Sequence, residues 1–210
     1  MIEDSQLYLF IVAALALLLV PGPAVLYITA RSASQGRLAG LVSVLAIETA
    51  NLTQAVAAAL GLAAILYSSA LAFNVVKYLG AAYLIYLGIN KLFFSNDPGT
   101  EEVVKPESLW RIYWQGFAVN ILNPKTALFF FAFLPQFVNP QRGSATSQTL
   151  ILGTIFVGLG IITDSMYALL ASSLAGQLKG SKSFQKGGRY FAGLIYIGLG
   201  ITTALTGSKK

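Results

Sequence analysis

The sequence predicts an all-α integral membrane protein in which six transmembrane helices form two inverted three-helix repeats, with breaks in helices 1 and 4. Three observations lead to this fold class. Hydrophobic residues make up 56% of the 210 positions and charged residues only 10%, whereas a soluble domain carries about 25% charged residues. Six apolar stretches approach the length of a bilayer crossing. Prolines interrupt two of these stretches at matching positions, which is typical of repeated membrane folds.

The six predicted spans follow one another along almost the whole chain. A transmembrane helix needs about 20 mainly apolar residues. The spans are Leu7–Ala30, Leu38–Leu66, Leu71–Phe94, Ile112–Val138, Leu150–Leu174 and Tyr190–Leu205. The first begins with an unbroken apolar run that resembles the core of a signal peptide, but Glu3 and Asp4 precede it instead of basic residues. We therefore expect a retained span and not a cleaved leader.

The basic residues lie mainly on one side of the predicted membrane. Nine of them follow spans one, three and five, and four lie on the opposite side. The first group is Arg31, Arg37, Lys91, Lys105, Arg111, Lys179, Lys182, Lys186 and Arg189, and the second is Lys77, Arg142, Lys209 and Lys210. Because cytoplasmic loops carry the excess of Lys and Arg, both termini are predicted outside the cytoplasm. The net charge of +6 is then explained by anionic lipid headgroups, and nucleic acid is not an expected partner.

A polar linker divides the chain into two halves that resemble each other. The matching pairs are Pro21 with Pro124, Ala24 with Ala127, Lys77-Tyr78 with Arg189-Tyr190, and Asn51 with Asp164 when Gly40 is aligned with Gly153. Three spans per half is an odd number, so the second half inserts upside down relative to the first. Chance similarity between apolar sequences is the alternative. The prediction is one transmembrane transporter domain over residues 1–210, with repeats at about 7–94 and 112–205 and a cytoplasmic linker at about 95–111.

Prolines deep in spans one and four predict breaks in both helices. A proline has no N–H and clashes with the carbonyl four residues earlier, so Pro21, Pro23 and Pro124 free carbonyl groups at Leu17, Leu19 and Asn120. Such groups survive in lipid only where protein or a water-filled cavity surrounds them. Paired breaks in inverted halves predict a midplane binding site, where half-helix N-termini attract a substrate carboxylate. Simple kinks without a ligand are the alternative. The predicted break and substrate-binding residues are Pro21, Gly22, Pro23, Asn51, Asn120, Asn123, Pro124, Lys125 and Thr126.

Few charged residues lie deep inside the predicted spans. Glu48 and Asp164 are the acidic ones, and Lys125 is the deepest cation, whereas Lys77 is expected to reach the headgroups. Glu48 and Asn51 fall on one face of span two by helical spacing, and Gln54 extends that face. Desolvation favours the neutral form of a carboxyl group. Asp164 and Glu48 are therefore candidates for coupling proton movement to transport, with structural pairs to Lys125 or an Asn as the alternative.

Several motifs resemble those of one known family. Span one contains Leu19-Val-Pro-Gly-Pro-Ala-Val, and span four contains Asn123-Pro-Lys-Thr-Ala followed by Phe133-Leu-Pro-Gln-Phe. Over nearly its whole length the chain resembles the LysE/RhtB family of amino-acid exporters. The resemblance implies a secondary transporter that exports an amino acid such as homoserine, threonine, lysine or leucine, or a close derivative, by proton antiport. It also implies the bacterial cytoplasmic (inner) membrane, so the side on which the basic residues place both termini is the periplasmic side.

Other functions fit the residues less well. Export of a divalent metal ion or another small metabolite is the first alternative, but the chain has no Cys or His ligands for soft metals and few carboxylates for hard ones. An intramembrane enzyme needs a nucleophile paired with a base, and no catalytic pair emerges. A purely structural membrane protein would not need paired breaks. We expect no cofactor and no metal, with an amino acid, protons and lipid as partners. Gly36 and Gly40 have the spacing of close helix contacts, so a homo-oligomer is also among the expectations.

Overall fold

The computed structural model describes residues 3–68 and 107–174, together with the isolated helical positions 78, 82, 85, 86, 89, 197 and 201. Every regular element in the two described ranges is helical, which confirms the all-α prediction for this part of the chain. Apart from these isolated positions, the predicted spans Leu71–Phe94 and Tyr190–Leu205 lie outside the described residues, as do the loop basic residues 179–189 and most of the linker.

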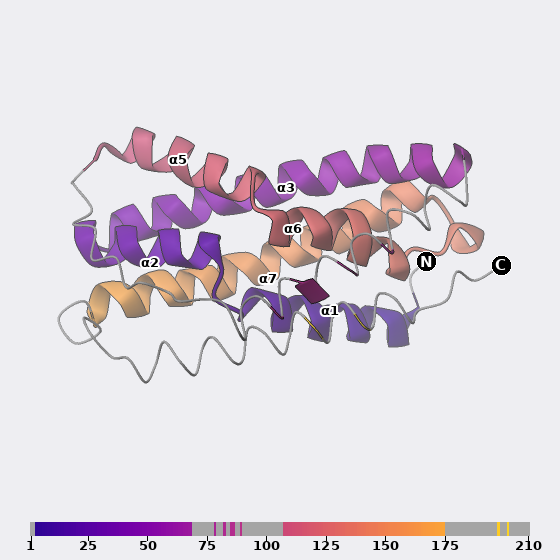
Figure 1. The fold of residues 1–210 in the computed structure, drawn as a ribbon, viewed down its shortest axis with the longest axis horizontal. Coiled ribbons are helices and arrows are strands. Elements are labelled where there is room, and N and C mark those ends of the chain that lie inside the picture. The colour runs from indigo at the N-terminus through magenta and orange to yellow at the C-terminus, as the bar shows by residue number, and fades with distance from the viewer. Residues whose placement is uncertain are drawn as a thin grey trace.

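The described elements are long helices, broken helices and short turns of helix (Figure 1). In chain order they are α1 (Asp4–Leu18), α2 (Pro23–Gln35), α3 (Arg37–Ser68), α5 (Leu109–Ile121), α6 (Pro124–Leu128), the π-helical turn η1 (Phe129–Phe133), the 3₁₀ turns η2 (Leu134–Phe137) and η3 (Pro140–Arg142), and α7 (Ala145–Ser173). Within these ranges, α3 and α7 are each long and apolar enough to cross a bilayer, and the number rises to four if each bent pair is one span.

Both predicted breaks are present. The axes of α1 and α2 differ by 53°, and those of α5 and the segment Pro124–Phe137 differ by 49°. In each case the second half-helix starts at a proline, Pro23 or Pro124. Proline suits the first helical position because its missing N–H would have no intrahelical partner there. The breaks therefore lie where the sequence predicts them and bend the two spans by similar angles.

The helix ends differ from the predicted span ends where polar residues begin a helix. α7 starts at Ala145 and not at Leu150, because the Ser144 side chain caps it by accepting a hydrogen bond from the Ser147 N–H. α5 starts at Leu109, inside the predicted linker, because Ser108 caps it in the same way. Hydropathy marks the apolar part of a helix, whereas capping residues set where the backbone begins to turn. The second span was predicted within two residues of α3.

Small residues bring α3 and α7 close together, and among the described helices this pair makes the most extensive contact. The backbone at Gly40 meets Ser32 and Ala168, and the backbone at Gly153 meets Ala55. A Cβ atom at Gly153 would lie 2.6 Å from the Cβ of Ala55. Residues early in α3 thus meet residues late in α7, so the two helices run antiparallel. Close approach through small residues is the usual way in which helices pack within lipid.

Aromatic side chains form the core beside this helix pair. Phe10 of α1, Phe129 and Phe133 of η1, and Phe156 of α7 are all buried, and the ring centroids of Phe129 and Phe156 are 4.4 Å apart. Many large apolar side chains on the outer faces of α3 and α7, such as Leu60 and Ile162, are exposed instead. This distribution is expected for a protein whose outer surface contacts hydrocarbon.

Ion pairs join the broken helices at both ends of the bundle. At one end, Arg31 of α2 pairs with Glu107 before α5 at 3.3 Å, and Glu107 also pairs with Arg111 at 3.1 Å. At the other end, Arg142 of η3 pairs with Glu3 before α1 at 3.1 Å, and both side chains are about half exposed. The two bent pairs of helices are therefore tied to each other at both ends.

Candidate functional site

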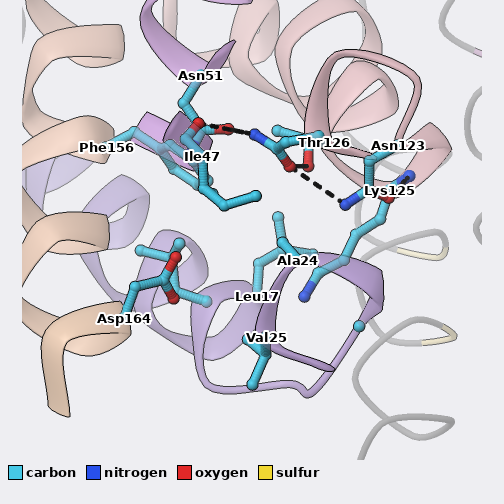
Figure 2. A pocket seen from close by; sticks show the side chains of 13 residues that line it. Leu17, Ala24, Val25, Ile47, Asn51, Asn123, Lys125, Thr126, Phe156 and Asp164 are labelled. Atoms are coloured by element: carbon cyan, nitrogen blue, oxygen red, sulfur yellow. Dashed lines mark hydrogen bonds between the residues drawn. The ribbon is translucent and has the colours of Figure 1, made fainter. Parts of the chain in front are cut away.

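A pocket lies between the two helix breaks (Figure 2). The cavity measures about 30 Å³, well below the about 300–1,000 Å³ of typical ligand sites, so it must widen before it can hold more than water. The lining residues are Leu17, Leu18, Gly22, Ala24, Val25, Ile47, Asn51, Asn120, Asn123, Lys125, Thr126, Phe156 and Asp164. They come from α1, α2, α3, α5, α6 and α7 and from the breaks, so the site depends on both halves of the chain.

Side chains donate hydrogen bonds to carbonyl groups at the breaks, in place of the missing helical N–H groups. Leu19 O accepts from the Tyr167 hydroxyl at 2.9 Å, and Val20 O accepts from the Lys125 ammonium at 2.6 Å. Asn120 O accepts from Gln54 Nε2 at 2.8 Å. Carbonyls at both breaks are thus bonded by side chains from other helices, as a membrane environment requires.

Amide side chains form one wall of the pocket. Asn120 is its centre: the Asn120 Nδ2 donates to Asn51 Oδ1 at 2.6 Å and to Ile47 O at 3.0 Å. The Asn120 Oδ1 accepts from Thr126 Oγ1 at 3.1 Å and from Asn123 Nδ2 at 3.3 Å. These bonds, several of which Figure 2 shows as dashed lines, join α3, α5 and α6 across the break. The amides at the break therefore bond chiefly to one another.

The two half-helices present different N-termini to the pocket. No side chain caps α2, and Gly22, Ala24 and Val25 at its start all line the pocket. By contrast, the Asn123 side chain caps α6 by accepting from the Lys125 N–H at 3.1 Å, and α6 has only five residues before the π-helical turn. Of the two predicted anion-attracting ends, the start of α2 is thus the one without a side-chain cap and with a full helix behind it.

Two carboxyl groups lie side by side next to the pocket. Glu48 and Asp164 are each 3% exposed, and their carboxyl groups are within reach of a side-chain hydrogen bond. Glu48 Oε2 accepts from Asn51 Nδ2 at 3.0 Å, and its carboxyl group packs against Gly160 of α7. Glu48 Oε1 has no donor among the described residues. A carboxylate only accepts hydrogen bonds, so a bond between two carboxyl groups requires a proton on one of them.

The structure brings most of the predicted site residues together. The predicted residues that line the pocket are Gly22, Asn51, Asn120, Asn123, Lys125, Thr126 and Asp164. The prolines Pro21, Pro23 and Pro124 lie at the breaks, and Glu48 contacts Asp164. The predictions did not include Tyr167, which bonds to the first break. Helical spacing offered a signal, because Tyr167 follows Asp164 by three residues and so shares its face of the helix. Val25, Ile47 and Phe156 were also missed, since apolar residues inside apolar spans carry no distinguishing pattern.

These features define a membrane protein with helices broken around a small polar site. The family model "LysE type translocator" matches residues 15–207, and the chain belongs to this family. It is therefore a transporter and not an enzyme. A membrane protein of Bacillus subtilis described as uncharacterized is 32% identical over 210 residues, covering 96% of this chain and 99% of the relative.

The other relatives include proteins with a stated activity. The homoserine/homoserine lactone efflux protein of Salmonella typhimurium is 28% identical over 190 residues, covering 90% of this chain and 92% of the relative. A membrane protein of Pseudomonas aeruginosa, also described as uncharacterized, is 25% identical over 205 residues, covering 95% of each chain. No solved structure matches the chain.

Proposed function

We propose that this protein exports an amino acid or a close derivative across the bacterial cytoplasmic membrane in exchange for protons. The observation that carries the proposal is the pocket between the two helix breaks, which combines the uncapped start of α2 with Lys125 and Asp164. The start of α2 offers donors for a carboxylate, and Asp164 offers an acceptor for an ammonium group, as a small zwitterion requires. The relative from Salmonella, which is named for efflux of homoserine and its lactone, supports a substrate of this size.

The export cycle needs a domain that can open to either side, and we propose the inverted repeat for this role. Aligning Gly40 with Gly153 also aligns Ala55 with Ala168. The contact between Gly40 and Ala168 then has the contact between Gly153 and Ala55 as its counterpart. This reciprocity is what a two-fold relation between the halves, at about 7–94 and 112–205, would produce.

The same alignment relates the donors at the breaks. Gln54 of α3 aligns with Tyr167 of α7. Gln54 donates to the break of the second half at Asn120, and Tyr167 donates to the break of the first half at Leu19. In this proposal α3 and α7 form a central pair around which the half-helices rearrange.

The charges at the two ends support the proposed orientation. Arg31, Arg37 and Arg111 gather at the end where α2 stops and α5 starts, which we assign to the cytoplasm. Glu3 and Arg142 mark the opposite end, and both chain termini are assigned to the periplasmic side.

Proton exchange is assigned to Asp164 and Glu48. Their carboxyl groups share one buried location, and Asp164 also lines the pocket. Two like charges in a dry site disfavour full ionisation of both groups. A proton held there during the return step would leave when the substrate enters.

The test is efflux from proteoliposomes loaded with labelled amino acids and derivatives, with and without an imposed pH gradient. Export of one subset, accelerated by an inward proton gradient, would support the proposal, and its loss in Asp164→Asn would assign coupling to that residue. Thr154→Val is the matched control, because this α7 side chain is exposed and bonds only to its own helix. Absence of flux for every compound, with folded protein, would reject the amino-acid assignment. Export that ignores the gradient would reject antiport.

A further inference from the structure

The ionisable side chains between the helix breaks do not balance. In the described ranges they are Glu48, Lys125 and Asp164, all buried, which makes two acids and one base and a net charge of −1 when all are ionised. The sequences of the predicted spans 71–94 and 190–205 add no Asp or Glu, and the lysines of the first, Lys77 and Lys91, lie toward its ends. An uncompensated charge in a membrane is costly. One monovalent cation at the site would remove the imbalance.

We infer that Asp164 selects the substrate by its ammonium group and that a substrate carboxylate is not required. The inference rests on the proposed export function and specifies its substrate class: small primary amines, with or without a free carboxylate. The proton and the substrate ammonium are then alternative cations for the same pair of carboxyl groups.

Lys125 is the obvious candidate for binding a carboxylate, but its ammonium already bonds within the protein. It donates to Val20 O at 2.6 Å, and in Figure 2 its side chain extends from α6 toward the start of α2. This bond stabilises the first break, because Val20 lies directly before Pro21. Binding a substrate carboxylate at Lys125 would compete with the bond that holds the break.

The amides of the pocket are also engaged. The side chain of Asn120 makes four hydrogen bonds within the cluster, and Asn51 links it to Glu48. A ligand would have to replace good hydrogen bonds to bind them, with little net gain. The amide wall therefore fixes the shape of the pocket and contributes less to binding.

Asp164 differs from these groups. It faces the pocket from α7 (Figure 2). Among the described residues, the titratable groups near it are Glu48 of α3, Lys125 of α6 and Tyr167 of its own helix, and the Tyr167 hydroxyl is engaged with Leu19 O. Glu48 is the buried neighbour whose Oε1 has no donor in the described part of the chain. A proton shared by Glu48 and Asp164 satisfies both acids when the pocket is empty.

Substrate entry then follows a balanced exchange. The ammonium group of the substrate approaches Asp164, and the shared proton leaves to the side to which the site is open. The charge between the breaks remains zero before and after if the ligand carries a single positive charge. The carboxylate of a zwitterion returns the net charge between the breaks to −1, unless that carboxylate reaches the donors at the start of α2. Amines without a carboxylate should therefore bind at least as well as the matching amino acid.

The experiment measures inhibition of labelled homoserine uptake into proteoliposomes by four unlabelled compounds. Homoserine and homoserinol (2-amino-1,4-butanediol) keep the amine, and homoserinol lacks the carboxylate; N-acetylhomoserine and 4-hydroxybutyrate keep the carboxylate and lack the ammonium. We expect homoserinol to inhibit as well as homoserine or better. The compounds without an ammonium should be weaker by about 30-fold or more, the effect of removing one partner of a buried charge pair. If homoserine is not carried, a labelled amino acid that is carried takes its place, with its own amino-alcohol and deaminated analogues.

Calorimetry in buffers of different ionisation enthalpy provides a second readout. Homoserinol binding should release close to one proton, and Asp164→Asn should lose both this release and the preference for amines, while Thr154→Val keeps both. Inhibition by the carboxylates but not by homoserinol would overturn the inference, as would amine binding without proton release. Failure of the proposed function looks different, because then no amino acid and no analogue is carried at all.

Discussion

A methyl group at Gly160 tests the contact that places Glu48 beside Asp164. A Cβ atom at Gly160 would lie 2.7 Å from Glu48 Cδ and 2.7 Å from Glu48 Oε2, and all three of its nearest atoms belong to Glu48. Carbon atoms do not approach this closely without displacement, so in Gly160→Ala the Glu48 side chain must move. Moving it breaks the 3.0 Å hydrogen bond from Asn51.

The size of the effect follows from opposing contributions. Replacing Gly by Ala inside a helix stabilises by about 0.5–1 kcal/mol. Overpacking costs about 1–3 kcal/mol, and the loss of a hydrogen bond to a charged group adds about 1.5–3 kcal/mol. We expect Gly160→Ala to lower the unfolding free energy by about 2–5 kcal/mol. Gly158→Ala is the matched control, because nothing lies within 4 Å of a Cβ there, and it should be neutral or slightly stabilising.

The assay is reversible unfolding in detergent micelles, followed by helical circular dichroism, together with proton-driven efflux of a carried substrate. Shortening the partner should relieve the clash, so adding Gly160→Ala to a Glu48→Ala protein should cost little. The assigned contact would be refuted if Gly160→Ala and Gly158→Ala had equal unfolding free energies. It would also be refuted if Gly160→Ala cost as much in the Glu48→Ala protein as in the unaltered one.

Three further predictions follow from described contacts. Tyr167→Phe should destabilise by about 1–3 kcal/mol, because Leu19 O loses its hydroxyl donor and no water replaces that donor within the hydrocarbon of a bilayer; unchanged unfolding would count against this role. Gln54→Leu should cost less than Tyr167→Phe, because Asn120 O loses the Gln54 donor and keeps the Asn123 N–H at 3.1 Å. Thr154→Val should cost less than either. Glu107→Gln breaks the ion pairs with two arginines at one end of the bundle. Since the chain has no cysteine, a single Val25→Cys substitution can report on access to the pocket. Glu107→Gln should speed labelling of this cysteine by an impermeant maleimide added from the proposed cytoplasmic side. An unaltered labelling rate would show that the ion pairs of Glu107 do not restrict access from the cytoplasm.

Sequence patterns were enough to predict the broken helices and most of the pocket. Proline at Pro23 and Pro124 has a backbone consequence that no tertiary contact can remove, so the breaks could be placed from residue identity alone. Buried charges in membranes are rare enough that Asp164 and Lys125 also stood out, and both line the pocket.

Predictions that depended on three-dimensional neighbours were weaker. A lysine near a break can bind a ligand, an acid or a carbonyl, and only the fold shows that Lys125 bonds to Val20 O. Both half-helix starts looked alike in sequence, yet Asn123 caps α6 and no side chain caps α2. Side-chain capping depends on rotamers and local geometry, which hydropathy does not encode. The closeness of Glu48 to Asp164 likewise depends on the missing side chain at Gly160, a detail of helix packing.

The donors at the breaks also bear on how the chain assembles in the membrane. The carbonyls of Leu19 and Val20, in the first broken span, are bonded by Tyr167 and Lys125, which follow them by more than a hundred residues. During synthesis the first three spans are made before either donor exists. Until the second half arrives, these carbonyls need water or a membrane insertase as a temporary partner. The first half alone should therefore be a poor membrane protein, and its final bend should form only when the two halves meet.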